Sequence, residues 1–106
     1  MSFLELDNIK VQEPVPGYKG KFVHSENQTI AFWEVDEGAA LPEHSHPHEQ
    51  ISTVVEGEFE LTINGSTKKV NKNSVAVIPA NIPHSGVALT KCKIIDVFYP
   101  VREEYK

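Results

Sequence analysis

The chain has 106 residues, a size that suits one domain with one core and leaves no room for a separate cofactor-binding module. Its formal charge is −5, from 15 acidic and 10 basic residues, so it lacks the basic surface that binds a phosphate backbone, and nucleic acid is not an expected partner. No apolar run approaches the roughly 18 residues that cross a bilayer, and we expect no membrane insertion.

The N-terminus and the cysteine content bear on location. Residues 1–7 show no basic region, apolar core or small-residue cleavage site, so no secretory signal is visible. The single Cys92 cannot form an intramolecular disulfide, which agrees with a reducing compartment. We expect a cytoplasmic protein.

Residues 1–16 combine aliphatic side chains with two prolines, and we expect an N-terminal arm or strand that lies at a dimer interface. Beyond them, short runs rich in β-branched and aromatic residues recur between Gly, Pro and Asn, without sustained helical periodicity. Strands are predicted at residues 20–24, 29–35, 50–56, 58–63, 66–70, 74–78, 86–89 and 93–99. Short strands at this regular spacing favour a small all-β barrel or jelly roll.

The clearest single unit is a hairpin. Residues 58–63 alternate strictly and run into Asn64-Gly65, a strong signal for a two-residue turn. Phe59, Leu61 and Ile63 should therefore face the core.

Two predicted strands, residues 29–35 and 93–99, are apolar on both faces. A strand of this kind is an aggregation liability when its outer face is exposed to water. We therefore expect a homodimer that covers the outer face.

Three imidazoles and an amide oxygen come from two separate segments, His44-Ser45-His46-Pro47-His48-Glu49-Gln50 and Pro79-Ala80-Asn81-Ile82-Pro83-His84. In an extended segment residues two apart point to the same side, so His44 and His46 can bind one ion, and His84 must arrive from elsewhere in the fold. Three such ligands leave coordination positions for water or substrate, which indicates a reactive metal site rather than a structural one.

These segments carry both motifs of the cupins, which the chain resembles. The first motif consists of Gly38, His44-Ser45-His46, Gln50 and Gly57, and the second runs from Asn73 through Pro79 to His84. Gln50 stands where the family usually has glutamate, and Asn73 and Asn81 replace its usual glycines. The resemblance implies one double-stranded β-helix domain over residues 1–106, with His44, His46, Gln50 and His84 as metal ligands.

A narrower resemblance, to the pectin-degradation cupins, rests on residues 44–50, 56–60 and 96–105. Those proteins linearise 4,5-unsaturated uronates released by polysaccharide lyases. The resemblance implies an anionic sugar as substrate, a divalent metal on the three histidines and Gln50, and substrate-binding or proton-transfer roles for Asp96, Phe98 and Arg102.

In the C-terminal segment, Asp96 and Arg102 each allow two interpretations. Asp96 shares a strand face with Ile94 and Phe98, so its carboxylate needs a partner, a shifted pKa or an opening to a pocket. It is either a structural carboxylate paired at a sheet edge or a general acid/base. Arg102 follows Pro100, so it either folds over a pocket mouth to bind a carboxylate or lies on the surface as an ordinary arginine.

Gln50 affects the expected chemistry. An amide leaves the full charge of a dication, which favours polarisation of a substrate oxygen over redox chemistry. Three nitrogens and one oxygen suit nickel, zinc, iron, manganese or cobalt. His48 follows Pro47 and is placed outside the ligand set or on the surface, and His24 is most simply a strand or turn residue.

Three functions follow as hypotheses. The first is a metal-dependent enzyme that opens and ketonises an unsaturated uronate. The second is a non-haem iron cupin dioxygenase, against which Gln50 counts. The third is a non-catalytic cupin that binds a small ligand or a metal, since one barrel supports many functions.

Overall fold

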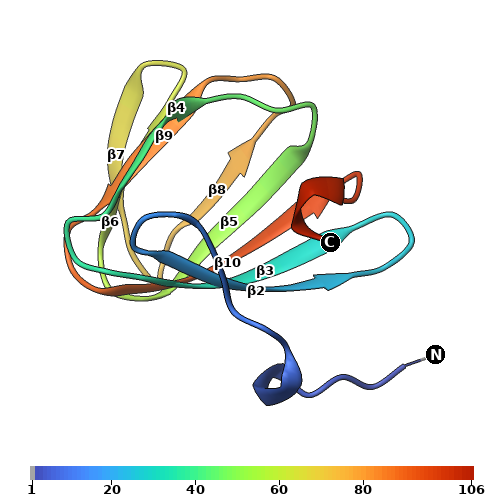
Figure 1. Ribbon diagram of the computed structural model, residues 1–106. Coiled ribbons are helices and arrows are strands. Elements are labelled where there is room, and N and C mark those ends of the chain that lie inside the picture. Colours follow the sequence, from blue (N-terminus) through green and yellow to red (C-terminus); the bar gives the residue numbers. More distant parts are fainter. Residues whose placement is uncertain (1) are drawn as a thin grey trace.

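The computed structural model describes residues 2–106 and is built almost entirely of β-strands (Figure 1). The strands are β1 (Gln12–Val15), β2 (Tyr18–His24), β3 (Thr29–Val35), β4 (Ala40–His44), β5 (Glu49–Glu56), β6 (Phe59–Ile63), β7 (Ser66–Val70), β8 (Val75–Ile78), β9 (His84–Ala88) and β10 (Cys92–Tyr99). Two short 3-10 turns, η1 (Leu6–Asn8) and η2 (Glu103–Tyr105), lie near the ends of the chain.

The strands form two antiparallel sheets that face each other across the core (Figure 1). The larger sheet has the order β1-β2-β3-β10-β5-β8, and the smaller has the order β4-β9-β6-β7. Apolar side chains from both sheets fill the space between them, among them Phe22, Trp33, Phe59, Leu61 and Ile94. The all-β jelly roll predicted from the sequence is confirmed.

The β6–β7 hairpin forms where the sequence predicts it. Asn64 and Gly65 have φ values of 48° and 81°, and a two-residue hairpin loop with positive φ at both positions matches the twist of its strands. Phe59 and Leu61 are buried on the inner face, and Ile63 packs against the same core.

Strand β10 lies inside the larger sheet, paired with β3 on one side and β5 on the other. Its burial alternates, so the side chains of Cys92, Ile94, Asp96 and Phe98 all point inward. The strand that carries Asp96 and Phe98 is therefore held by hydrogen bonds along both edges.

Strand β4 is absent from the expectations above. The strand contains Pro42, and β4 is an edge strand of the smaller sheet, where a missing backbone N–H is tolerated. Strand β9 begins at His84, two residues earlier than predicted.

Of the arm expected over residues 1–16, Met1 lies outside the described residues. The arm contains η1 and β1, and Phe3 and Leu4 are 88% and 61% exposed. The outer face of β5, β8 and β10 carries further exposed apolar side chains, namely Ile51, Val55, Val75, Val77 and Tyr99. Among the described residues, no helix has the length and apolar character needed to span a membrane.

Candidate metal centre

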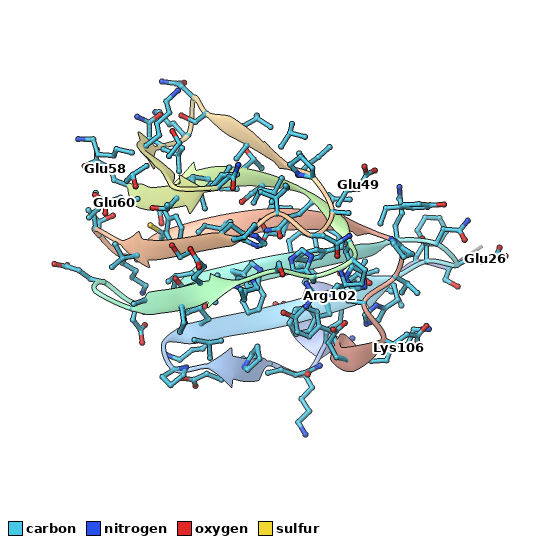
Figure 2. The ribbon with its side chains drawn as sticks, turned by 90° about the horizontal axis from the view of Figure 1, so that it is seen from above. Glu26, Glu49, Glu58, Glu60, Arg102 and Lys106 are labelled. Carbon is cyan, nitrogen blue, oxygen red and sulfur yellow. The ribbon has the colours of Figure 1, made fainter. Side chains whose placement is uncertain are left out.

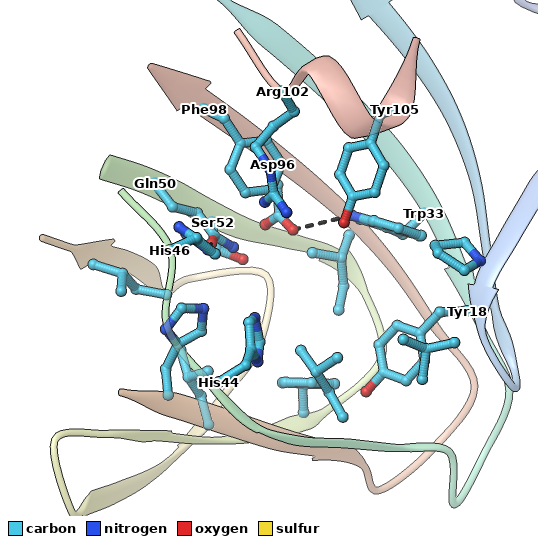
Figure 3. Close-up of a pocket in the computed structure, with 18 residues that line it drawn as sticks. Tyr18, Trp33, His44, His46, Gln50, Ser52, Asp96, Phe98, Arg102 and Tyr105 are labelled. Atoms are coloured by element: carbon cyan, nitrogen blue, oxygen red, sulfur yellow. Dashed lines mark hydrogen bonds between the residues drawn. The ribbon is translucent and has the colours of Figure 1, made fainter. Parts of the chain in front are cut away.

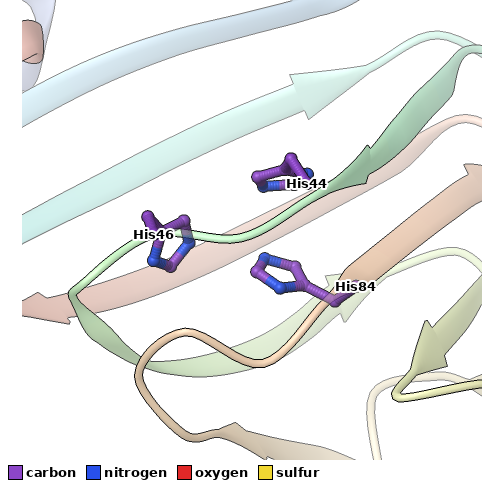
Figure 4. A group of neighbouring side chains, drawn as sticks. All are labelled: His44, His46 and His84. Atoms are coloured by element: carbon purple, nitrogen blue, oxygen red, sulfur yellow. The ribbon is translucent and has the colours of Figure 1, made fainter.

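Three histidines meet at one end of the barrel (Figure 4). His44 ends β4, His84 begins β9, and the two residues are paired across the smaller sheet. His46 lies two residues beyond the end of β4, and its side chain reaches the same place as that of His44, as the two-residue spacing predicts. One nitrogen from each ring lies within 4.8 Å of the others. Ligands bonded to one ion at about 2.1 Å lie at most about 4.2 Å apart, so small side-chain rotations complete the set.

Each of these imidazoles is oriented by a backbone carbonyl. Nδ1 of His44 lies 2.9 Å from the Pro42 carbonyl, Nδ1 of His46 lies 2.9 Å from that of His48, and Nδ1 of His84 lies 2.9 Å from that of Ile82. A carbonyl oxygen only accepts, so every Nδ1 carries the hydrogen and every Nε2 keeps a free lone pair. This tautomer is the one in which histidine binds a metal through Nε2.

Burial keeps two of the rings neutral. Desolvation, with smaller contributions from the Arg102 and His84 charges, lowers the pKa of His46 to about 4. Desolvation also lowers the pKa of His84. Nε2 of His84 is buried and has no hydrogen-bond partner among the described residues. A buried, bare nitrogen beside two similar ones fits a bound cation.

The fourth predicted ligand, Gln50, lies at the start of β5, with its side-chain oxygen 3.2 Å from Nε2 of His46. The amide oxygen has no hydrogen to donate, and the His46 Nε2 is bare, so two lone pairs approach each other. A cation at this point satisfies both atoms. The donor set of three nitrogens and one oxygen therefore fits a divalent transition metal.

Asp96 lies beside this group, on β10. Its Oδ2 accepts a hydrogen bond from the Trp33 indole N–H at 3.0 Å, whereas Oδ1 is buried without a partner of good geometry among the described residues. Burial raises the pKa of Asp96, and the nearby Ser52, Gln50, Trp33 and Arg102 only oppose that rise. Because β10 is interior to its sheet, the edge-paired interpretation of this carboxylate is wrong.

Arg102 is not a surface residue, because its side chain is only 10% exposed. The guanidinium carbon lies 4.7 Å from the centre of the Phe98 ring and 4.6 Å from that of the Tyr105 ring. Nε donates to Oε1 of Glu104 at 2.9 Å. Figure 2 places Arg102 and Glu49 toward one end of the molecule, with Glu58 and Glu60 at the other.

The structure brings all seven predicted site residues together, although they come from different segments of the chain. One cavity is lined by His44, His46, Gln50, His84, Asp96, Phe98 and Arg102 (Figure 3). The cavity also contains residues that the sequence interpretation missed, including Tyr18, Trp33, Ser52 and Tyr105. Trp33 reaches Asp96 because the register of β3 and β10 pairs Trp33 with Ile94, two residues before Asp96 on the same face. Tyr105 had no comparable signal, because it lies beyond the last strand.

The two remaining histidines have different surroundings. His48 is buried, and its carbonyl orients His46. His24 ends β2 and lies between the Thr29 hydroxyl, at 2.8 Å, and the Tyr105 carbonyl, at 3.2 Å. Neither belongs to the group of three whose ring nitrogens converge.

A family model of the cupin domain matches residues 31–98, which is more than half of the chain. The chain is a cupin. A protein of Streptomyces coelicolor described as uncharacterized is 22% identical to this cupin over 102 residues, covering 94% of this chain and 97% of its own length.

Two solved structures resemble this cupin over its whole length. An RmlC-like cupin from Shewanella frigidimarina has a TM-score of 0.93 and 27% sequence identity, covering 100% of this chain and 96% of its own. KdgF from a Halomonas species has a TM-score of 0.92 and 29% identity, covering 100% of this chain and 99% of its own. The resemblance to KdgF-like cupins that the sequence motifs indicated is therefore confirmed.

Proposed function

We propose that this cupin is a metal-dependent enzyme that converts 4,5-unsaturated uronates into their linear keto form. The observation that carries the proposal is the buried Asp96 carboxylate, which has one oxygen without a hydrogen-bond partner among residues 2–106 and shares a cavity with three convergent histidines and with Arg102. The likeness to KdgF, together with the activity that the pectin-degradation motifs imply, supports it.

The reaction is an isomerisation, so substrate and product have the same atoms. The anomeric hydroxyl loses its proton, the bond between C1 and the ring oxygen breaks to give an aldehyde, C5 becomes a ketone, and C4 gains a proton. A divalent metal held by His44, His46, Gln50 and His84 supplies Lewis-acid polarisation of substrate oxygens when bound.

The protein's own groups manage the proton and the charge. The Trp33 indole holds Oδ2 of Asp96, which leaves Oδ1 to accept the proton and deliver it to C4. Phe98 presents its ring to the sugar, and Arg102 binds the carboxylate through its planar guanidinium. The apolar core side chains that floor the cavity limit the entry of water.

The dioxygenase hypothesis has less support, because the amide of Gln50 leaves the ligand set without a carboxylate. A non-catalytic binding role gives no reason for a carboxylate buried with an unpartnered oxygen at the site.

We also propose that residues 1–106 form one domain and that two copies associate through the outer face of β5, β8 and β10, with residues 1–16 at the interface. The exposed apolar side chains of that face and of the arm support this arrangement. A cytoplasmic location is proposed on the basis of the lone, buried Cys92.

The test is an anaerobic incubation of metal-loaded protein with 4,5-unsaturated galacturonate, with the loss of the enol-ether absorbance followed over time. We expect rapid loss with the wild type, and only the buffer rate with Asp96→Ala or after chelation of the metal. A wild-type rate equal to that of buffer would contradict the proposed reaction.

A further inference from the structure

The C-terminal turn is fastened to the barrel by a chain of hydrogen bonds whose directions can be assigned. The Arg102 backbone N–H donates to the Thr29 hydroxyl oxygen at 2.8 Å. The Tyr105 carbonyl only accepts, so Nε2 of His24 donates to it at 3.2 Å, and Nδ1 of His24 is left to accept from the Thr29 hydroxyl at 2.8 Å. Gln12 donates to the same Tyr105 carbonyl at 3.3 Å. Both ends of the turn are thus held by β1, β2 and β3.

This fastening fixes two side chains over the cavity. The Tyr105 ring stacks on Phe22, with centroids 4.2 Å apart and planes inclined by 13°. The Arg102 guanidinium lies against the Tyr105 and Phe98 rings at cation–π distances. We call Arg102, Glu104 and Tyr105 the clamp, and these contacts hold the Arg102 guanidinium and the Tyr105 ring at the cavity.

The guanidinium is only partly neutralised. Glu104, whose side chain is 52% exposed, bonds to Nε of Arg102 and not to its two Nη groups. Arg102 lines the same cavity as the three histidines, so its charge faces the interior of the cavity. A buried cation that faces a cavity in this way suits an anionic ligand group.

The Tyr105 hydroxyl points into the same cavity, toward Trp33 and Asp96 (Figure 3). Resting on the function proposed above, we propose that Tyr105 is a specificity-determining residue whose hydroxyl and the Nη groups of Arg102 together bind the substrate carboxylate. Glu104 is the positioning residue that sets the orientation of Arg102. The clamp makes the site selective for acidic sugars over their neutral esters.

Trp33 offers a readout that does not depend on turnover. It is the single tryptophan, it donates to Asp96, and its ring centroid lies 6.1 Å from that of Tyr105. Its fluorescence should therefore change when the cavity fills. Galacturonate and its methyl ester are matched probes, because they differ in the negative charge.

The experiment titrates metal-free and metal-loaded protein with both probes. We expect wild type to bind the acid more tightly than the ester, and Tyr105→Phe to lose about tenfold of that preference, the size of one hydrogen bond to a charged group. Tyr99→Phe is the matched control, because Tyr99 is half exposed on the outer face. Equal preference in Tyr105→Phe and wild type, or no wild-type preference for the acid, would overturn the inference.

Glu104 is tested by kinetics. Glu104→Gln should raise KM for the unsaturated acid several-fold and leave kcat within about twofold, and Glu104→Asp should recover part of the loss. Glu103→Gln is its control, because Glu103 pairs with Lys106 at the surface. An unchanged KM in Glu104→Gln contradicts the positioning role.

The two proposals fail separately. Acid preference that disappears in Tyr105→Phe, without turnover of the unsaturated sugar by wild type, supports the clamp and removes the proposed reaction. Turnover by wild type with no effect of Tyr105→Phe on acid preference supports the reaction and removes the clamp.

Discussion

On the wall of the cavity, Oδ2 of Asp96 accepts a hydrogen bond from the Trp33 indole, whereas Oδ1 has no hydrogen-bond partner within the described part of the chain. Burial raises the pKa of Asp96 in the folded protein. Such a group stabilises the fold at a pH below the pKa that it has in the unfolded chain, and this contribution is lost as the pH rises through its pKa in the folded protein. At neutral pH the charged form of Asp96 is therefore a net cost to folding.

We predict that Asp96→Asn stabilises the metal-free protein by about 1 kcal/mol while it removes most turnover, because the amide keeps the indole contact and loses the buried charge. Thermal unfolding and the absorbance assay measure the two effects. Asp36→Asn, at an exposed ion pair, should change neither. If Asp96→Asn is less stable than wild type, the folded protein stabilises the charged Asp96 carboxylate, and the prediction is wrong.

The histidines predict the opposite pH trend. His46 has its pKa lowered to about 4 in the folded protein, so the unfolded chain binds more protons below its ordinary pKa of 6.5. The stability contribution is complete above pH 6.5 and is lost as the pH falls toward 4. Urea unfolding of metal-free protein between pH 7.5 and 4.5 should show this loss, with a weaker dependence in His46→Gln. Parallel profiles for the two proteins would contradict the assignment.

At the scale of single elements, β9 must pass close to a cavity side chain. A Cβ on Gly86 would lie 2.3 Å from the Phe59 ring, which is shorter than any ordinary contact. Gly86→Ala must therefore push Phe59 toward the cavity.

We expect Gly86→Ala to destabilise the protein by about 1–3 kcal/mol, the usual cost of overpacking, and to weaken galacturonate binding. Ser85→Ala, on the opposite face of β9, serves as the control. Chemical denaturation checks the first effect, and Trp33 fluorescence checks the second. Wild-type behaviour in both would mean that Phe59 has room to move elsewhere.

The elements that the sequence predicted well are those whose signals are local. The β6–β7 hairpin follows from alternation and Asn64-Gly65, and the inward row of β10 follows from the two-residue period. Strand β4 could not be found this way, because Pro42 is acceptable only if the strand lies at an edge, and edge position is a property of the whole sheet.

The residues of the site likewise fall into those with a local sequence signal and those without one. The motif spacing indicated the three histidines that converge, whereas the contact of Trp33 with Asp96 depends on the register between β3 and β10. Tyr105 reaches the cavity because η2 folds back onto β2, a long-range contact with no local sequence signature.

At the scale of the whole molecule, the outer face of the larger sheet stands out. Val75 and Val77 are both 66% exposed on β8, which is an edge strand, and the exposed Ile51 pairs with Val77 on the neighbouring strand. Such a surface favours association of two copies.

We predict that Val77→Lys converts a wild-type dimer into a monomer, because it buries a charge in the proposed interface. Light scattering coupled to size-exclusion chromatography measures the mass directly. Thr67→Lys, on the smaller sheet, should leave the mass unchanged. A monomeric wild type would remove the dimer proposal.

Three of the four proposed metal ligands lie on the two sheets, and His46 lies in the loop between β4 and β5. His44 and His84 belong to the smaller sheet, whereas Gln50 belongs to the larger one. An ion bound to all of them would act as a reversible cross-link between the two sheets and would stabilise the folded form by mass action. Removal of the metal should therefore speed amide hydrogen exchange first in β4 and β9, while the β6–β7 hairpin keeps its protection. Metal supply would then govern the lifetime of the protein against proteolysis as well as its activity.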